Sequence, residues 1–256
     1  MTNDEIQEAL IQLEHQRNIK ILYACESGSR AWGFPSPDSD YDIRFIYVHP
    51  MEWYLSVFPD KDTIDIPITG DSDMGGWELR KSFGLLKKSN CALIEWLSSP
   101  IVYKQNTQAI APLKSLVRPA FLSISSCHHY FSMAKRKFDD ISSSQTCKLK
   151  TYFYAFRAAL CALHIIDEQS PPPMEITKLK DRYLTSDLLP QYDKLLSEKV
   201  ANTESHHSTR LEWLDSFIQE SLSYIEQNIP EHQNKLATEA FDAAFRDTLH
   251  TVWGSK

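Results

Sequence analysis

Residues 19–48 contain the pattern that decides the fold, and they read Ile19-Lys20-Ile21-Leu22-Tyr23-Ala24-Cys25-Glu26-Ser27-Gly28-Ser29-Arg30-Ala31-Trp32-Gly33-Phe34-Pro35-Ser36-Pro37-Asp38-Ser39-Asp40-Tyr41-Asp42-Ile43-Arg44-Phe45-Ile46-Tyr47-Val48. A first apolar run stops before Gly28, and a second one starts after Asp40. Short apolar runs bounded by turn residues are typical of β-strands. The stretch therefore predicts a strand, a turn with a short helix, and a second strand.

Two aspartates stand at the start of the second predicted strand. Because residues i and i+2 of a strand project from one face, we expect Asp40 and Asp42 to point together while Tyr41, Ile43 and Phe45 face a core. Neighbouring carboxylates repel each other unless a cation lies between them. Mg²⁺ (or Mn²⁺) suits such oxygen ligands and often binds substrate phosphates as well. The alternative interpretation is a pair of solvated aspartates where a strand begins.

The turn before these aspartates has the composition of a phosphate-binding turn. A glycine at position 28 lets the backbone approach a ligand closely, and the amides of a turn that enters a helix form an anion-binding concavity. A phosphate held at Gly28 and Ser29 would neighbour a metal held by the aspartates. Together the two features predict metal-assisted chemistry on a phosphoryl group.

The spacing of these motifs resembles the signature of the DNA polymerase β-like nucleotidyltransferase superfamily. The fuller text is similar to its bacterial branch of predicted nucleotidyltransferases, also called the RNA-repair-pathway DNA polymerase β family. The resemblance covers about residues 20–104, thins afterwards, and rests on residues 28–33, 39–45, 76–81 and 95–103, with an island at 150–157. It implies transfer of a nucleoside monophosphate from a nucleoside triphosphate to an acceptor hydroxyl, with release of pyrophosphate.

The resemblance also implies a third carboxylate on a neighbouring strand, which completes the metal site or acts as a base. Asp65 is the preferred candidate, because Ile64 and Ile66 alternate with it and leave it on a face that can match that of Asp40 and Asp42. Glu78 is the alternative. It stands at the start of a predicted helix, where an acidic residue also has a purely stabilising role.

Several further residues are candidates for contacts with the nucleotide. Ser39 and Arg30 lie within the motif text, and Arg44 has two interpretations, a phosphate contact or an ion pair with a carboxylate. Farther on, the predicted helix at 148–166 aligns three side chains at i, i+4 and i+7: Lys150, Tyr154 and Arg157. In relatives with a helical second domain such a stripe stacks a base and holds phosphates. A surface stripe with a partly buried tyrosine is the alternative.

The chain as a whole is expected to be an α+β protein of 256 residues in two domains. Residues 1–105 are predicted to form a small mixed sheet of the nucleotidyltransferase type with flanking helices, namely the catalytic domain. Strand patterns are missing from residue 108 onward, so residues 106–256 are predicted to be an all-helical, substrate-binding domain that closes a cleft over the sheet. The break near Ser89 and Asn90 predicts two helices between residues 77 and 97.

Charge and composition bear on the partners. The net charge of −7 argues against a protein that coats nucleic acid through bulk attraction. Residues 118–157 nevertheless contain seven lysines and arginines against two acidic residues, which is compatible with local RNA contact. The resemblance favours an RNA 3′ end as the acceptor. A protein or small-molecule hydroxyl is the second hypothesis, and a nucleotide-binding partner protein without turnover is the third.

The cellular location is inferred from what the sequence contains. No apolar run has the length of a membrane span, and the first residues are polar and acidic. The five cysteines are scattered, without a Cys-x-x-Cys pair, which favours reduced thiols. We therefore expect a cytoplasmic protein that makes no membrane contact.

Overall fold

The computed structural model describes residues 1–58, 60–70, 72–231 and 235–254. The chain divides into two compact units, each made of separate stretches of sequence. The first unit comprises Met1–Gly28, Asp40–Phe121 and Lys235–Lys256, and the second comprises Ser29–Ser39 and Leu122–Asn234.

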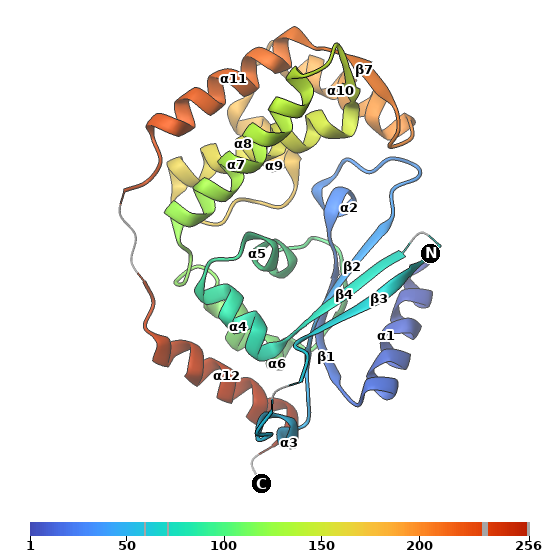
Figure 1. The fold of residues 1–256 in the computed structure, drawn as a ribbon, viewed down its shortest axis with the longest axis vertical. Coiled ribbons are helices and arrows are strands. Elements are labelled where there is room, and N and C mark those ends of the chain that lie inside the picture. Colours follow the sequence, from blue (N-terminus) through green and yellow to red (C-terminus); the bar gives the residue numbers. More distant parts are fainter. Residues whose placement is uncertain (59, 71, 232–234, 255–256) are drawn as a thin grey trace. The chain divides into compact units, whose positions relative to one another are not determined.

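The first unit is built on a five-stranded mixed sheet, as the sequence predicted (Figure 1). The strands are β1 (Lys20–Glu26), β2 (Tyr41–Val48), β3 (Thr63–Thr69), β4 (Ser72–Glu78) and β5 (Val102–Gln105). Their order across the sheet is β3-β4-β2-β1-β5. β2 and β4 are parallel, and the other neighbouring pairs are antiparallel.

Helix α1 (Asn3–Arg17) covers one face of this sheet. It begins with a capping box, in which Thr2 Oγ1 accepts from the Glu5 amide and the Glu5 carboxylate accepts from the Thr2 amide. Its apolar stripe, Ile6 and Leu10 among others, packs in one core cluster with residues of β2. This confirms a flanking helix on the sheet and the inward face predicted for the second strand.

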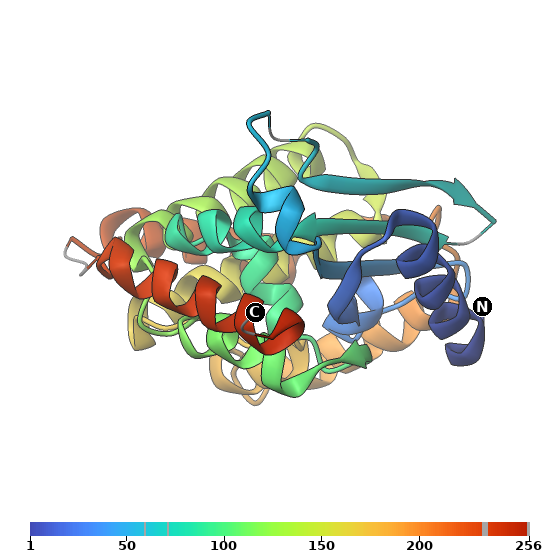
Figure 2. The same cartoon turned by 90° about the horizontal axis from the view of Figure 1, so that it is seen from below.

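The remaining helices of the first unit lie between or after the strands in sequence, and they pack against one another. They are α3 (Met51–Tyr54), α4 (Leu79–Lys87), α5 (Cys91–Leu97), α6 (Thr107–Ser115) and α12 (Thr238–Trp253). The predicted break between two helices near residue 90 is confirmed, since Asn90 caps α5 by accepting from the Leu93 amide. Figure 2 shows α12, in red, alongside α4 and α6, with which it is in contact.

The two units differ from the division at residue 105 that the sequence suggested. α12 belongs with the sheet, where Phe245 contacts the rings of Tyr54 and Phe83, and α6 is in contact with both α12 and β1. Residues 29–39 belong with the second unit, where Trp32 packs edge-on against Tyr154 at 5.0 Å between ring centroids. Aromatic contacts between residues far apart in the chain set both assignments, and periodicity cannot reveal such contacts.

The second unit is mainly helical. It contains α7 (Ser123–Ser142), α8 (Leu149–Glu168), α9 (Ile176–Tyr183), α10 (Leu189–Ala201) and α11 (Glu212–Gln227), and α2 (Gly28–Trp32) enters it from the first unit. Two short antiparallel strands, β6 (Thr146–Lys148) and β7 (His207–Thr209), qualify the all-helical prediction. Neither is long enough to show an alternating pattern. No helix among the described residues is long and apolar enough to cross a membrane.

Strand β4 was not predicted, because it contains two glycines in succession, and glycine is depleted in strands. The structure explains Gly76. A Cβ there would lie 2.1 Å from Cε2 of the fully buried Phe45 ring, whereas a Cβ on Gly75 would meet Asp65 and Arg44 at ordinary contact distances of 3.5 and 3.6 Å. β4 therefore fits beside β2 at position 76 only because a side chain is missing there.

This constraint predicts the effect of a single methyl group. We expect Gly76→Ala to lower the free energy of unfolding by about 1–3 kcal/mol, since the Phe45 ring is packed and has little room to move. Urea denaturation measures the change. Gly84→Ala is the control: position 84 lies in α4 with open space around it, so alanine should stabilise by about 0.5–1 kcal/mol. A Gly76→Ala protein as stable as the wild type would contradict this account of β4.

Candidate functional site

The bend after β1 lies directly against the first acidic strand. β1 and β2 pair antiparallel, and the Ser27 amide donates to the Asp42 carbonyl at 2.8 Å. Gly28 has a φ of +62°, and a Cβ there would lie 2.1 Å from Asp42 Oδ2. Only glycine allows this approach. The structure thus brings the glycine of the predicted phosphate turn into contact with a carboxylate of the predicted metal pair.

The two aspartates occupy the end of β2 that is nearest this bend. Asp40 is exposed and immediately precedes the strand, and the Asp42 side chain is 32% exposed. Ile43 and Phe45 are buried in the core on the other face. Asp42 therefore projects from the face of the sheet that is opposite α1, as the alternation predicted.

Arg44 neutralises this acidic face by bridging two strands. Its Nη2 donates to Asp42 Oδ1 at 3.2 Å and to Asp73 Oδ2 at 2.6 Å. Asp73 is the register partner of Asp42 in the parallel β2–β4 pair, so their side chains stand side by side. Of the two interpretations of Arg44, the structure displays the ion pair. The guanidinium occupies the position between two carboxylates in which a cation is expected.

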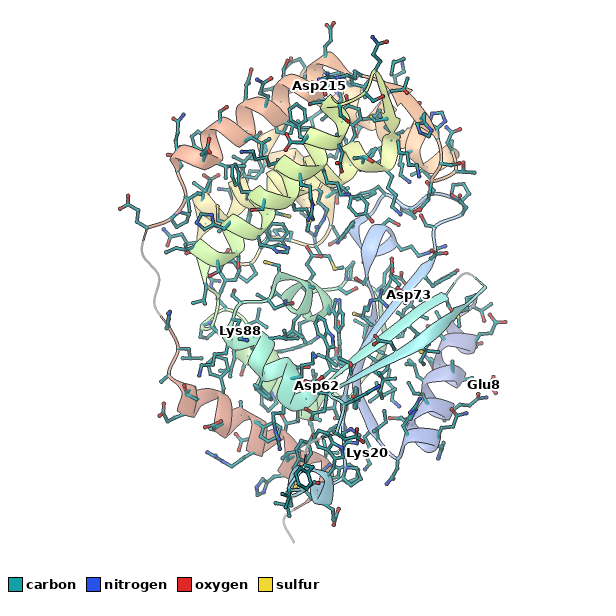
Figure 3. The ribbon with its side chains drawn as sticks, in the orientation of Figure 1. Glu8, Lys20, Asp62, Asp73, Lys88 and Asp215 are labelled. Carbon is teal, nitrogen blue, oxygen red and sulfur yellow. The ribbon has the colours of Figure 1, made fainter. Side chains whose placement is uncertain are left out.

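Sequence reasoning missed Asp73. It falls shortly before the two glycines of β4, where no strand was predicted. The available signal was the alternation of partly exposed Asp73 with Met74, whose side chain is buried in the core. Figure 3 labels Asp73 and shows it at the end of the β3–β4 pair that is farther from Asp62.

Asp65 lies on the predicted face, but in a different row of register partners from Asp42. Its register partner is Gly75, which in turn pairs with Arg44. Asp65 Oδ1 lies 3.5 Å, and Arg44 Nη1 3.6 Å, from the point where a Cβ of Gly75 would be. The row that contains Asp42 holds Asp73 instead. Asp65 therefore shares the acidic face without standing beside Asp42.

Glu78 is placed at the other end of β4. It is 1% exposed and caps α4, since its Oε2 accepts from the amides of Arg80 at 2.7 Å and Lys81 at 3.2 Å. Tyr54 also donates a hydrogen bond to it, and burial raises the pKa of its carboxyl group. Five residues of strand, about 16 Å, separate it from Asp73. This position gives Glu78 the stabilising role at the helix start.

A divalent cation at the acidic face would have few protein ligands. Within the described residues, no three acidic, histidine or cysteine side chains are gathered closely enough to hold a metal ion. Mg²⁺ commonly takes only one or two carboxylates and completes its coordination with water and substrate phosphates. Asp40 and Asp42 are the two carboxylates at this strand edge that would hold such an ion.

The serines of the motif belong to a hydrogen-bonded loop in the second unit. Ser29 and Ser39 are both buried, and the Ser29 hydroxyl donates to Ser39 Oγ at 3.2 Å. Arg30 Nη2 donates to the Ser39 carbonyl at 2.8 Å. The two ends of the loop, ten residues apart, are therefore tied together.

The stripe on α8 contacts the same loop. Tyr154 packs on Trp32, and the Arg157 guanidinium lies 4.5 Å above the Trp32 ring while it donates to the Met174 carbonyl. Arg157 is only 3% exposed, so it holds Trp32 and Met174 in place. Lys150 is partly exposed and pairs with Glu204 at 2.6 Å. The stripe thus lies against residues 29–39 within the second unit.

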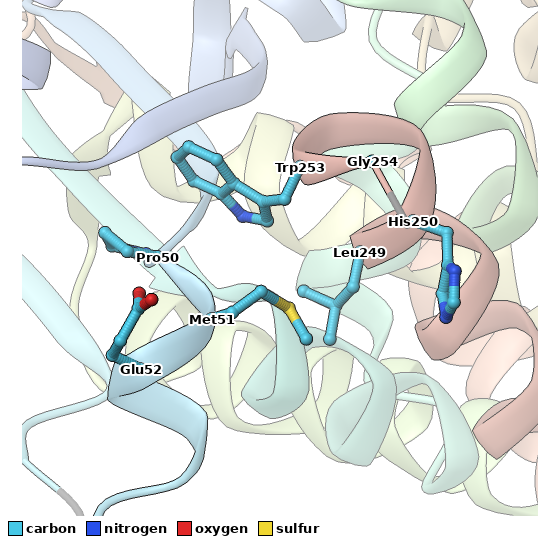
Figure 4. A pocket seen from close by; sticks show the side chains of 7 residues that line it. All are labelled: Pro50, Met51, Glu52, Leu249, His250, Trp253 and Gly254. Carbon is cyan, nitrogen blue, oxygen red and sulfur yellow. The ribbon is translucent and has the colours of Figure 1, made fainter. Parts of the chain in front are cut away.

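An apolar pocket elsewhere in the first unit contains none of these residues. Figure 4 shows its lining at α3 and α12, which includes Met51, Leu249 and Trp253. Its volume is about 410 Å³, and its lining carries little of the polar chemistry that phosphoryl transfer requires. The acidic face of the sheet therefore remains the candidate site.

A mixed sheet that sets a Gly-Ser bend against an Asp-x-Asp strand is the arrangement expected from the nucleotidyltransferase-like spacing of the motifs. Comparison with known sequences agrees: the family described as "RNA repair pathway DNA polymerase beta family" (RlaP) matches residues 2–247. The chain belongs to that family. Membership of this family supports a nucleotidyltransferase-type function.

Two individual proteins are similar to this chain. The "Uncharacterized protein YcgL" of Bacillus subtilis (strain 168) is 39% identical over 249 residues, which cover 96% of each chain. A solved structure, a nucleotidyltransferase-like protein from Exiguobacterium sibiricum 255-15, is 12% identical with a TM-score of 0.31, and the match covers 96% of this chain and 79% of that one.

Proposed function

We propose that the protein is a Mg²⁺- or Mn²⁺-dependent nucleotidyltransferase that adds a nucleoside monophosphate to an acceptor hydroxyl. The observation that carries the proposal is the contact between Asp42 and Gly28, which sets a metal-ligand carboxylate beside the glycine of a phosphate-binding turn. Asp40, two residues earlier on the same strand edge, is the second ligand.

The reaction exchanges a phosphoanhydride bond of the triphosphate for a phosphoester bond to the acceptor. The acceptor oxygen forms a bond to the α-phosphorus, the bond from that phosphorus to the β-bridging oxygen breaks, and pyrophosphate leaves. The hydroxyl proton passes to a carboxylate of the acidic face. The divalent ion, when bound, lowers the pKa of the attacking hydroxyl and neutralises charge on the phosphates. Asp40 and Asp42 hold the ion, and the Gly28 and Ser29 backbone receives phosphate oxygens.

Residues of the second unit are proposed to recognise the rest of the nucleotide. Lys150 is partly exposed and carries the charge that attracts phosphate, and the half-buried Tyr154 offers a ring face to a base. Arg30 and Ser39 shape the loop that follows the turn. Arg157 holds Trp32 in place, because its guanidinium packs on the face of that ring.

An RNA 3′ end is the acceptor that we favour. The family description refers to RNA repair, and residues 118–157 contain seven basic side chains against two acidic ones. The net charge of −7 favours the alternative acceptor, a hydroxyl of a protein or small molecule. The third possibility, nucleotide binding without turnover, is consistent with the ion pair that Arg44 makes with Asp42.

Labelled triphosphates separate these functions. The purified protein is incubated with Mg²⁺, each α-labelled nucleoside triphosphate, and either RNA or lysate. We expect label on RNA and at least about a 100-fold loss in the Asp40→Asn/Asp42→Asn double variant, because the metal ligands are gone. Asp62→Asn is the control, since Asp62 is an exposed aspartate at the other end of the same sheet.

The remaining outcomes decide among the alternatives. Label on protein or on a small molecule would show that this molecule, and not RNA, is the acceptor. Triphosphate binding without any product would indicate the non-catalytic function. Activity that survives in the double variant, with its fold verified by circular dichroism, would contradict the assignment of the two aspartates.

We further propose that Asp73 is the third carboxylate, because it stands in register with Asp42 while Asp65 is one row away. Asp73→Asn should reduce the transfer rate by at least about tenfold, as expected for loss of a general base. Asp65→Asn should change it less than about threefold. The reverse order of the two effects would restore Asp65, the residue predicted from sequence.

A further inference from the structure

Within the second unit, Glu204 in the loop between α10 and β7 contacts the hydrogen-bonded loop of residues 29–39. Glu204 Oε1 accepts from Ser39 Oγ at 2.9 Å, and Glu204 Oε2 accepts from Lys150 Nζ at 2.6 Å. The Glu204 amide donates to Asp38 Oδ1 at 2.8 Å. The Glu204 carboxylate therefore accepts a hydrogen bond from a buried hydroxyl and forms an ion pair with a lysine.

The hydroxyl of Ser39 is oriented to donate to an anion. A serine hydroxyl has one hydrogen to donate and two lone pairs to accept with. Ser39 Oγ accepts from the Ser36 amide at 2.9 Å and from the Ser29 hydroxyl at 3.2 Å, so both lone pairs are engaged. Its hydrogen is left for Glu204. The buried surroundings hold this direction, because Ser29, Ser36 and Ser39 are each at most 5% exposed.

Positive charge accumulates around the same point. Lys199 is 2% exposed and donates from Nζ to Ser36 Oγ, the neighbour of Ser39 in this network. Burial lowers the pKa of its ammonium group, Lys150 lowers it further, and Glu204 and Asp38 raise it. Two lysines and an oriented hydroxyl form a set of donors typical of a site for a phosphoryl group.

We propose that the Ser39 hydroxyl and the Lys150 ammonium form a binding site for a phosphoryl group of the nucleoside triphosphate, and that Glu204 occupies this site until the nucleotide displaces it. The inference rests on the proposed function for the identity of the ligand. Glu204 acts as an internal competitor, because its carboxylate uses the same two donors as a phosphate oxygen would. The Glu204 side chain is partly exposed and lies in the loop between α10 and β7. It can therefore leave without the unfolding of a helix.

The alternative role for Glu204 is a permanent tie that only holds the loop in place. The two roles predict opposite effects of removing the charge. A competitor that is removed frees the site and tightens anion binding, whereas a lost structural tie loosens the loop and weakens or does not change anion binding.

Isothermal titration with Mg²⁺ and either inorganic tripolyphosphate or each nucleoside triphosphate tests the proposal. Glu204→Gln should bind both kinds of ligand roughly threefold to tenfold more tightly than the wild type, the range expected when one partly exposed charged pair no longer competes. Lys150→Met should bind them more weakly by a similar factor. Glu198→Gln is the matched control, since Glu198 pairs with His206 beside the same loop without contacting Ser39 or Lys150.

A second variant keeps the test valid if Glu204→Gln folds poorly. Asp38→Asn weakens the contact to the Glu204 amide and leaves the Glu204 carboxylate intact, so it should tighten binding in the same direction by a smaller factor. If the wild type binds triphosphate and neither variant binds it more tightly, the proposal for Glu204 is wrong while the proposed function stands. If Glu204→Gln and the wild type bind neither ligand, the proposed function fails with it.

Discussion

The register between β1 and β2 is the constraint on which the candidate site depends. It sets Asp42 against Gly28, so that a carboxylate and a turn with a glycine at positive φ lie at one edge of the sheet. A strand that slips by one residue turns every side chain to the opposite face. Such a slip would bury Asp42 and expose Ile43. The packing of Ile43 and Phe45 beneath α1 therefore maintains the chemistry on the other face.

The parallel pairing of β2 with β4 adds a second condition. It brings Asp73 beside Asp42. Two neighbouring carboxylates repel each other, which costs free energy unless a cation compensates their charge. Arg44 supplies the compensation from within the chain. In the second unit Glu204 has the inverse relation to Lys150, with an internal anion beside a cation. In both units a charge of the protein occupies a position that the proposed substrate or metal ion would otherwise use.

Much of this fold could be predicted from sequence, because its strands alternate and its helices are periodic. The mixed sheet, α1, the α4–α5 break and α8 all followed from local patterns. β4 did not, since Gly75 and Gly76 have no side chain with which to show a period, and the need for glycine at position 76 depends on the Phe45 ring of another strand. The attachment of α12 to α4 and α6 depends on aromatic contacts over long separations, which a single sequence does not reveal.

The same limit applies to the candidate site. Asp40, Asp42, Gly28 and Ser29 could be proposed from the sequence because the motif is local, and the structure places Asp42 against Gly28 of the bend. Asp73 and Glu204 escaped notice because their relevance arises from partners on other elements, Arg44 and Lys150. Helical periodicity placed Arg157 on one stripe of α8 with Lys150 and Tyr154. The burial of its side chain against Trp32, however, depends on a loop more than a hundred residues earlier.

Anomalous diffraction from crystals grown with Mn²⁺ and a non-hydrolysable nucleoside triphosphate tests the central claim most directly. The account predicts a manganese peak bonded to the carboxylates of both Asp40 and Asp42, with nucleotide phosphates beside Gly28. A nucleotide bound with no manganese at these aspartates, or with Arg44 still joined to an unliganded Asp42, would contradict it.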